Sequence, residues 1–136
     1  MGQKTTEVLS QILTLAIDED AKAIPLFVAE RACRVSNIAF TTEAAVNKAN
    51  TNYNVYVVGK GTASTIGTIQ NGPNSTSGTS FTAKTAQALT VVTTARVNEL
   101  AVGDVVWLSS TKEGNGLAMG RTLVEVTIAF PSDSAS

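Results

Sequence analysis

The residues of this chain that can carry acid–base chemistry are mainly carboxylates, because the sequence contains no histidine. Histidine is the commonest general base and the usual partner of a serine or cysteine nucleophile, so Ser–His–Asp and Cys–His machinery is excluded. A glycosidase needs two carboxylates facing each other across a cleft, and the candidates are Asp104, Glu113 and Glu125. Nothing in their spacing demands that arrangement, so we expect the chain not to be an enzyme.

Two short motifs are similar to ion-binding and phosphate-binding loops but lack required positions. Asp18, Glu19 and Asp20 bring three carboxylates together, yet the glycine and glutamate of an EF-hand loop do not follow at the right offsets. Residues 59–62, Gly-Lys-Gly-Thr, lack the first glycine of a P-loop, and no helical pattern follows them. We interpret the motifs as a solvated acidic turn and a strand-ending turn, and we expect neither metal nor cofactor.

Two side chains with possible chemistry are interpreted as structural. Cys33 is the only cysteine, so the fold cannot depend on an intramolecular disulfide, and we expect its thiol to behave as a small buried hydrophobe. Trp107 lies in the apolar run of residues 105–108, which favours a core position over a role in stacking against a ligand.

The composition is typical of one domain with a neutral, hydroxyl-rich surface. The chain has 136 residues, of which 43% are hydrophobic and 15% charged, and its formal net charge is -1. This length is enough for one hydrophobic core. Because the chain has no run of Lys or Arg, we do not expect a nucleic acid partner. Because its apolar stretches are far shorter than the roughly 20 residues that span a bilayer, we do not expect a membrane partner.

Short runs of β-branched residues, separated by Gly, Asn, Pro and Ser, predict a mostly β protein. In residues 122–130 the apolar side chains occupy alternate positions, as in a strand with one buried face. Further strands are predicted at residues 12–17, 24–29, 33–40, 53–60, 62–70, 80–84, 87–94 and 104–110. About eight short strands without repeated βα units predict an all-β fold, a two-layer antiparallel β-sandwich that is jelly-roll-like.

The segments between these strands have different predicted structures. Pro25 near the start of residues 24–29 favours an edge or opening strand, because proline lacks the N–H that a central strand must donate. Residues 42–49 are predicted to form one or two helical turns capped by Thr42. Residues 71–79 and 110–116 are predicted to be polar, exposed loops.

The N-terminal third is compatible with two kinds of element. Residues 8–16 carry apolar side chains at helical spacing, whereas Leu13, Leu15 and Ile17 alternate as in a strand. We favour a strand at residues 12–17, and the helix stays open as the alternative. The predicted organisation is a flexible N-terminal arm, a single β-sandwich domain and a disordered tail: residues 1–11, 12–131 and 132–136.

Several segments carry a resemblance to a known family. They are residues 25–29, 33–35, 40, 43–46, 53–56, 89, 102–106, 110–112 and 123–126. Together they resemble small structural proteins of tailed-bacteriophage particles, of the head-decoration or capsid-cement type. The likeness is one of pattern; it covers most of the chain but not the arm before Leu13. It implies a β-sandwich on the outer surface of the virion, assembled in the host bacterial cytoplasm, that bridges neighbouring subunits of the major capsid protein.

Two hypotheses follow about how such a protein makes its contacts. Residues 2–9 begin polar and end in an isolated apolar pair, so we hypothesise that they order on a neighbouring subunit. The candidate contact residues of this arm are Lys4, Glu7, Val8 and Leu9. A homo-oligomer, with a trimer favoured, is the second hypothesis, because charge is low and both faces of the strand around Val105 are apolar.

The alternative function is a carbohydrate- or receptor-binding module of a phage fibre or tail. It would use the loops at residues 71–79 and 110–116. Sugar-binding sites usually expose aromatic rings, and these two segments contain none, so this alternative ranks second.

Overall fold

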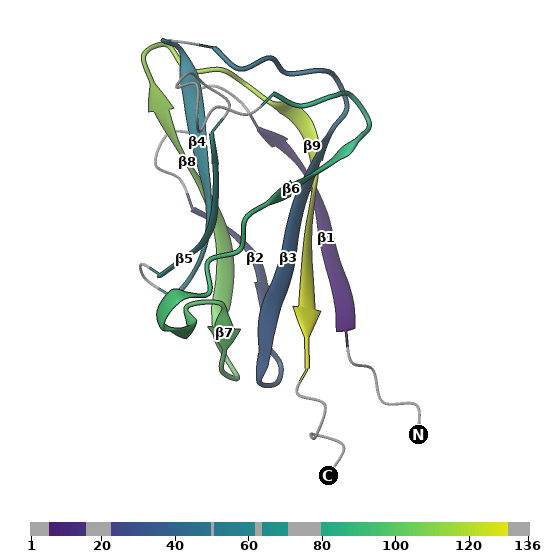
Figure 1. Ribbon diagram of the computed structural model, residues 1–136, viewed down its shortest axis with the longest axis vertical. Coiled ribbons are helices and arrows are strands. Elements are labelled where there is room, and N and C mark those ends of the chain that lie inside the picture. The colour runs from purple at the N-terminus through teal and green to yellow at the C-terminus, as the bar shows by residue number, and fades with distance from the viewer. Residues whose placement is uncertain (1–5, 16–22, 50, 62–63, 71–79, 131–136) are drawn as a thin grey trace.

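The computed structural model describes residues 6–15, 23–49, 51–61, 64–70 and 80–130, which form a two-layer β-sandwich (Figure 1). Within these residues there are nine strands and one short 3-10 turn, Thr94–Arg96. The strands are β1 (Thr6–Leu15), β2 (Ala23–Val28), β3 (Cys33–Thr42), β4 (Tyr53–Lys60), β5 (Ser64–Gln70), β6 (Ala86–Leu89), β7 (Glu99–Leu100), β8 (Val105–Glu113) and β9 (Gly120–Ala129). The all-β prediction is therefore confirmed.

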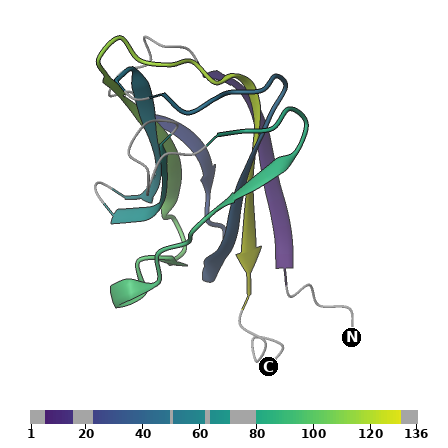
Figure 2. The ribbon, with the colours of Figure 1, turned by 45° about the horizontal axis from the view of Figure 1, so that its top comes forward.

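The order of the strands is that of a jelly roll (Figure 1, Figure 2). Sheet one has the order β1-β9-β3-β6, with β7 also pairing with β3, and sheet two has the order β2-β8-β4-β5. All pairs are antiparallel: β1 pairs with β9, β2 with β8, β3 with β6 and β7, and β4 with β5, as in one long hairpin. The hairpin is rolled so that β9 also pairs with β3 and β8 with β4, which gives the two layers.

The core lies between the two sheets and is built by alternating side chains. Phe40 of β3 is fully buried; its ring packs edge-on against Tyr56 of β4 and stacks with Phe81. In β9, Val124, Val126 and Ile128 point inward, as the sequence predicts. Burying a side chain of this size contributes about 1.5–3 kcal/mol, so packing between the layers accounts for much of the stability.

Most strand predictions are confirmed, with changed ends. The predicted strand at residues 53–60 coincides with β4, and the predicted edge strand with Pro25 is β2, at the edge of sheet two. The loop predicted at residues 110–116 is wrong for its first four residues, because β8 continues to Glu113 by pairing with β4. The turn itself follows at Gly114, which has a left-handed φ of 61°.

Two other predictions are wrong because long-range pairing overrides local preference. The helical turns predicted at residues 42–49 are absent: Thr42 is buried at the end of β3, and Val46 forms an isolated bridge with Phe81. That bridge is also the only strand-like pairing in residues 80–84, which were predicted to be a strand. The strand predicted at residues 87–94 is the shorter β6.

The N-terminal boundary is also corrected. Strand β1 begins at Thr6 and pairs with β9 over ten consecutive residues, so residues 6–11 belong to the sandwich and not to a flexible arm. The helical alternative for this segment is excluded by the same pairing. The rest of the predicted arm, the acidic turn at Asp18–Asp20, the loop at 71–79 and the tail at 132–136 lie outside the described residues.

Candidate functional site

The three carboxylates considered for catalysis are not brought together. Asp104 lies in the turn before β8, where its carboxylate accepts a hydrogen bond from the backbone N–H of Ala101 at 2.8 Å. Glu113 is the last residue of β8, so at about 3.3 Å per residue it lies about 30 Å from Asp104. Glu125 lies on the outer face of the other sheet. No pair of these groups faces across a cleft.

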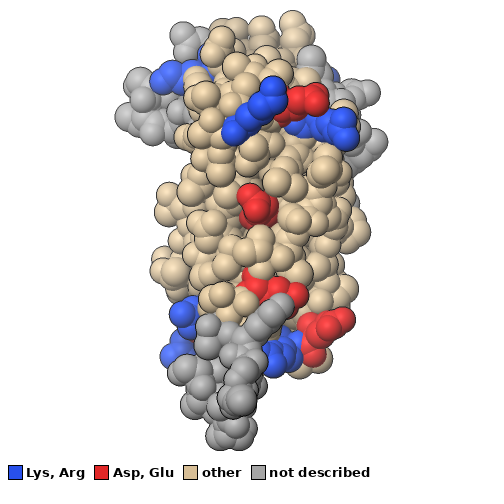
Figure 3. Space-filling model, turned by 90° about the vertical axis from the view of Figure 1, so that its right-hand side faces the viewer, with Lys and Arg blue, Asp and Glu red and all other residues tan. Residues whose placement is uncertain are grey.

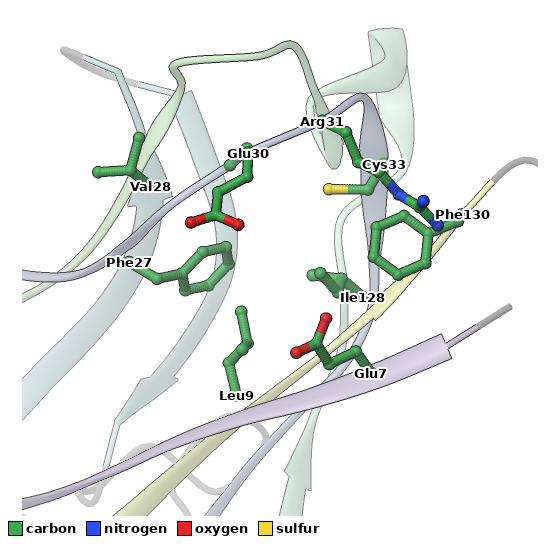
Figure 4. A pocket seen from close by; sticks show the side chains of 10 residues that line it. Glu7, Leu9, Phe27, Val28, Glu30, Arg31, Cys33, Ile128 and Phe130 are labelled. Carbon is green, nitrogen blue, oxygen red and sulfur yellow. The ribbon is translucent and has the colours of Figure 1, made fainter. Parts of the chain in front are cut away.

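A groove of about 600 Å³ opens at one side of the sandwich, between edge strands β1 and β2 (Figure 4). Its apolar lining includes Leu9, Phe27 and Phe130. The carboxylates of Glu7, from β1, and Glu30, from the turn after β2, point into the same space from opposite sides. The groove therefore combines an apolar floor with acidic walls.

The upper end of the groove is closed by Arg31 and Cys33. The guanidinium carbon of Arg31 lies 3.6 Å from the ring centroid of Phe130, a cation–π contact that positions both side chains. Burial raises the pKa of the Cys33 thiol; the Arg31 charge opposes this, while Asp104 and Glu7 reinforce it. A raised pKa keeps the thiol protonated at neutral pH, where it is a poor nucleophile, in agreement with the structural role predicted for Cys33.

One hydrogen bond links the two sheet edges beside the groove. The Nε2 of Gln11 in β1 donates to the carbonyl oxygen of Leu26 in β2 at 2.5 Å. A smaller hollow beside it is lined by Leu9, Phe27 and Val126. The seam between the edges is thus partly apolar and is bridged near its middle by this side chain.

The outer face of sheet one is the second candidate surface. Figure 3 shows that charged side chains gather toward its two ends and that the area between them is mostly uncharged, with an acidic group in its middle. The strand register explains this pattern, because the central row across the sheet is Ser10, Glu125, Ala39 and Ala88. The row beside it is Ile12, Leu123, Thr41 and Ala86.

The predicted contact residues of the arm are divided between these two surfaces. Val8 lies on the outer face of sheet one and is 55% exposed. Glu7 and Leu9 point to the opposite side of β1 and line the groove. Lys4 lies outside the described residues. The alternation from Glu7 to Leu15 was the available signal that these residues form a strand.

Trp107 is not a core residue, contrary to the prediction. Its neighbours Val106 and Leu108 are buried, so the indole points to the outer face of sheet two and is half-buried. The ring packs over Gly59, where an added Cβ would lie 2.5 Å from it. Its Nε1–H donates to the carbonyl oxygen of Gly61 at 2.6 Å. Because Gly59 on the neighbouring strand has no side chain, the indole ring can pack against the outer face of the sheet.

Comparisons with known proteins add no assignment: no protein-family model, no curated protein and no solved structure matches this chain. Within the described ranges, no group of three or more His, Cys, Asp or Glu side chains is placed to hold a metal ion. No helix in that part of the chain is long and apolar enough to cross a membrane. The groove and the outer face of sheet one are therefore the two candidate functional surfaces.

Proposed function

We propose that this chain is a non-enzymatic structural protein of a phage virion, which decorates the capsid and bridges neighbouring major capsid subunits. The observation that carries the proposal is the mostly uncharged outer face of sheet one, which has an acidic group in its middle (Figure 3). The jelly roll supports the proposal only by analogy, because viral capsid domains are among the many kinds of protein that have this architecture.

The chemistry of this face suits contact with another protein. The centres of protein interfaces are depleted of charged residues, and their rims are polar. Here Glu125 is the charged residue of the central row, beside Ser10, Ala39 and Ala88, whereas Lys84 and Arg121 lie beside the shallow hollow at one end. Small side chains let another backbone approach closely, and few charges must be dehydrated on contact.

Repetition on a particle makes weak contacts sufficient. Once a decoration protein has bound one capsid subunit, its next contact is effectively intramolecular. A single strong hot spot is therefore not required, which agrees with a face that carries small side chains.

The experiment compares two threonine substitutions on opposite faces. Thr41→Glu adds a charge near the centre of the sheet-one face, and Thr111→Glu adds one to the outer face of sheet two. Each variant is mixed with empty shells of the major capsid protein of the encoding phage and sedimented with them. We expect the wild type and Thr111→Glu to co-sediment, and Thr41→Glu to bind at least about tenfold more weakly.

Circular dichroism melting checks that both variants are folded. A wild-type chain that does not bind the shells contradicts the decoration proposal. Equal binding by the two variants contradicts the assignment to the sheet-one face.

The carbohydrate-binding alternative has weaker support. Residues 110–113, the first four of the seven residues of one predicted binding loop, belong to strand β8, and the other predicted loop lies outside the described residues. The exposed aromatic ring that a sugar site usually needs is not supplied by Trp107, one face of which packs on Gly59. Consistent binding on a glycan array would reverse this ranking.

A further inference from the structure

The four edges of the sandwich differ in how they resist pairing with another strand. At the edges of sheet two, β2 contains Pro25 and a register shift after it, and the pairing of β5 with β4 is irregular at Val58. In sheet one, β6 is only four residues long. Bulges, prolines and short strands are the usual protection of sheet edges.

Strand β1 has none of these protections. It is ten residues long, contains no Pro, Lys or Arg, and keeps an unbroken register with β9. No other strand of the described residues pairs with its free side. Its backbone is therefore a template for a further strand.

The side chains of β1 are arranged symmetrically about Ser10. Val8 and Ile12 lie on the same face of the strand, two residues to either side of Ser10, and are 55% and 63% exposed. We propose that β1 pairs antiparallel with β1 of a second copy of this chain, about a two-fold axis at Ser10. The pairing places Val8 of each copy opposite Ile12 of the other, which makes two apolar pairs on the outer face, one on each side of the paired Ser10 residues.

Other two-fold registers are less favourable. An axis at Leu9 or at Gln11 would place Ser10 opposite one of the two exposed apolar side chains and leave the other opposite a threonine. A slip of one residue in the pairing would instead put the outward side chains of one strand on the same side as the inward side chains of the other. In the proposed register Glu7 lies opposite Leu13 of the second copy, so no like charges meet.

The groove beside β1 supports the same occupant. Leu9, Leu26 and Phe27 are only partly buried along the seam between β1 and β2. The added strand would direct its own Leu9 and Leu13 toward this seam, because they share the inward face of β1. The second copy would thus cover apolar surface that one copy leaves open to water.

This inference does not depend on the proposed capsid function. It predicts a two-fold dimer, whereas the sequence led us to expect a trimer. The molecular mass of the oligomer in solution distinguishes the dimer from the trimer. The dimer would join the mostly uncharged faces of two sheets into one continuous surface.

Disulfide trapping tests the axis directly. Residues directly opposite in an antiparallel pair have Cα atoms about 4.5–5.5 Å apart, within the reach of a disulfide. We expect Ser10→Cys to form a covalent dimer on mild oxidation. Thr14→Cys, four residues farther along the same exposed face, should not, because its two copies would lie about 25 Å apart. Wild-type chain controls for Cys33, which is buried.

Absence of the Ser10→Cys dimer, or an equal yield from Thr14→Cys, overturns the proposal. Sedimentation at micromolar concentration supplies the second test. The wild type should be a dimer, and a monomer or a trimer overturns the proposal.

Charge exchange tests the register. Val8→Lys alone and Ile12→Glu alone should each weaken the dimer at least about tenfold, because each sets a charge against an apolar side chain. The double variant Val8→Lys, Ile12→Glu should recover dimerisation, because each new lysine then faces a new glutamate. Thr111→Lys, at an exposed position on the outer face of sheet two, is the matched control and should dimerise like the wild type. Failure of the double variant to recover contradicts the register even if the single variants weaken the dimer.

Discussion

Strands β1 and β2 border the same groove, yet they end their sheets in different ways. β1 is ten residues long and regular, whereas β2 is six residues long and contains both a proline and a register shift. The exposed apolar side chains of β1, Val8 and Ile12, lie symmetrically about Ser10, but Val28 is a single exposed apolar side chain at the end of β2. One edge is therefore protected against pairing and the other is available for it.

This difference shows how one fold can separate stability from contact. Both strands are fixed by their inner neighbours, β9 and β8, and by the core between the sheets. What remains free on β1 is its outer edge and face. We infer that contacts with other subunits can form there without rearrangement of the core.

The largest expected effect distinguishes the ends of the two strands. Leu15, the last residue of β1, is 1% exposed, whereas Val28, the last residue of β2, is 54% exposed. Leu15→Ala should lower the free energy of unfolding by about 2–5 kcal/mol, because it leaves a cavity in the core. Val28→Ala should change it by less than about 0.5 kcal/mol. Urea denaturation measures both, and equal losses would contradict the difference between the two ends.

A smaller effect tests whether both edges depend on one core. Burial raises the pKa of Tyr56 from 10.0 to about 12, against a smaller opposing effect of the Met119 backbone. The folded state therefore holds this proton more tightly than the unfolded state does, and the resulting stability is complete below pH 10. It should be lost between about pH 10 and 12, by about 2 kcal/mol.

Far-UV circular dichroism follows both sheets, and Trp107 fluorescence follows sheet two alone. The two probes should lose stability together over this range. Tyr56→Phe is the control and should show a smaller loss. Separate transitions of the two probes would show that the two sheets do not share one cooperative core.

The smallest effect concerns the link between the edges. Gln11→Ala removes the hydrogen bond to the carbonyl oxygen of Leu26, which should cost about 0.5–1.5 kcal/mol of stability. Thermal denaturation measures the loss, with Ser10→Ala on the outer face of β1 as the matched control. A Gln11→Ala variant as stable as the control would show that packing alone holds the two edges together.

The sequence predicted those parts of the fold in which local pattern and tertiary pairing agree. Alternation located β4 and the inward side chains of β9, and Pro25 marked an edge strand. Prediction failed where pairing overrides pattern: Thr6 begins a strand despite its polar neighbours, and the polar end of β8 continues to pair with β4.

The candidate surfaces were less predictable than the strands. The groove joins Glu7, Phe27 and Phe130, which lie far apart in sequence and meet only because the hairpin is rolled. Trp107 was placed in the core because its run is apolar throughout, and only the position of Gly59 on the neighbouring strand explains its outward packing. The contact role of Val8 stays a prediction.

The proposal that this chain decorates a phage capsid is tested most directly by cryo-electron microscopy of purified virions. We predict jelly-roll density on the outside of the head, with the face formed by β1, β9, β3 and β6 against the major capsid protein. Density in which that face is open to solvent while other strands touch the capsid, or heads without this protein, would contradict it.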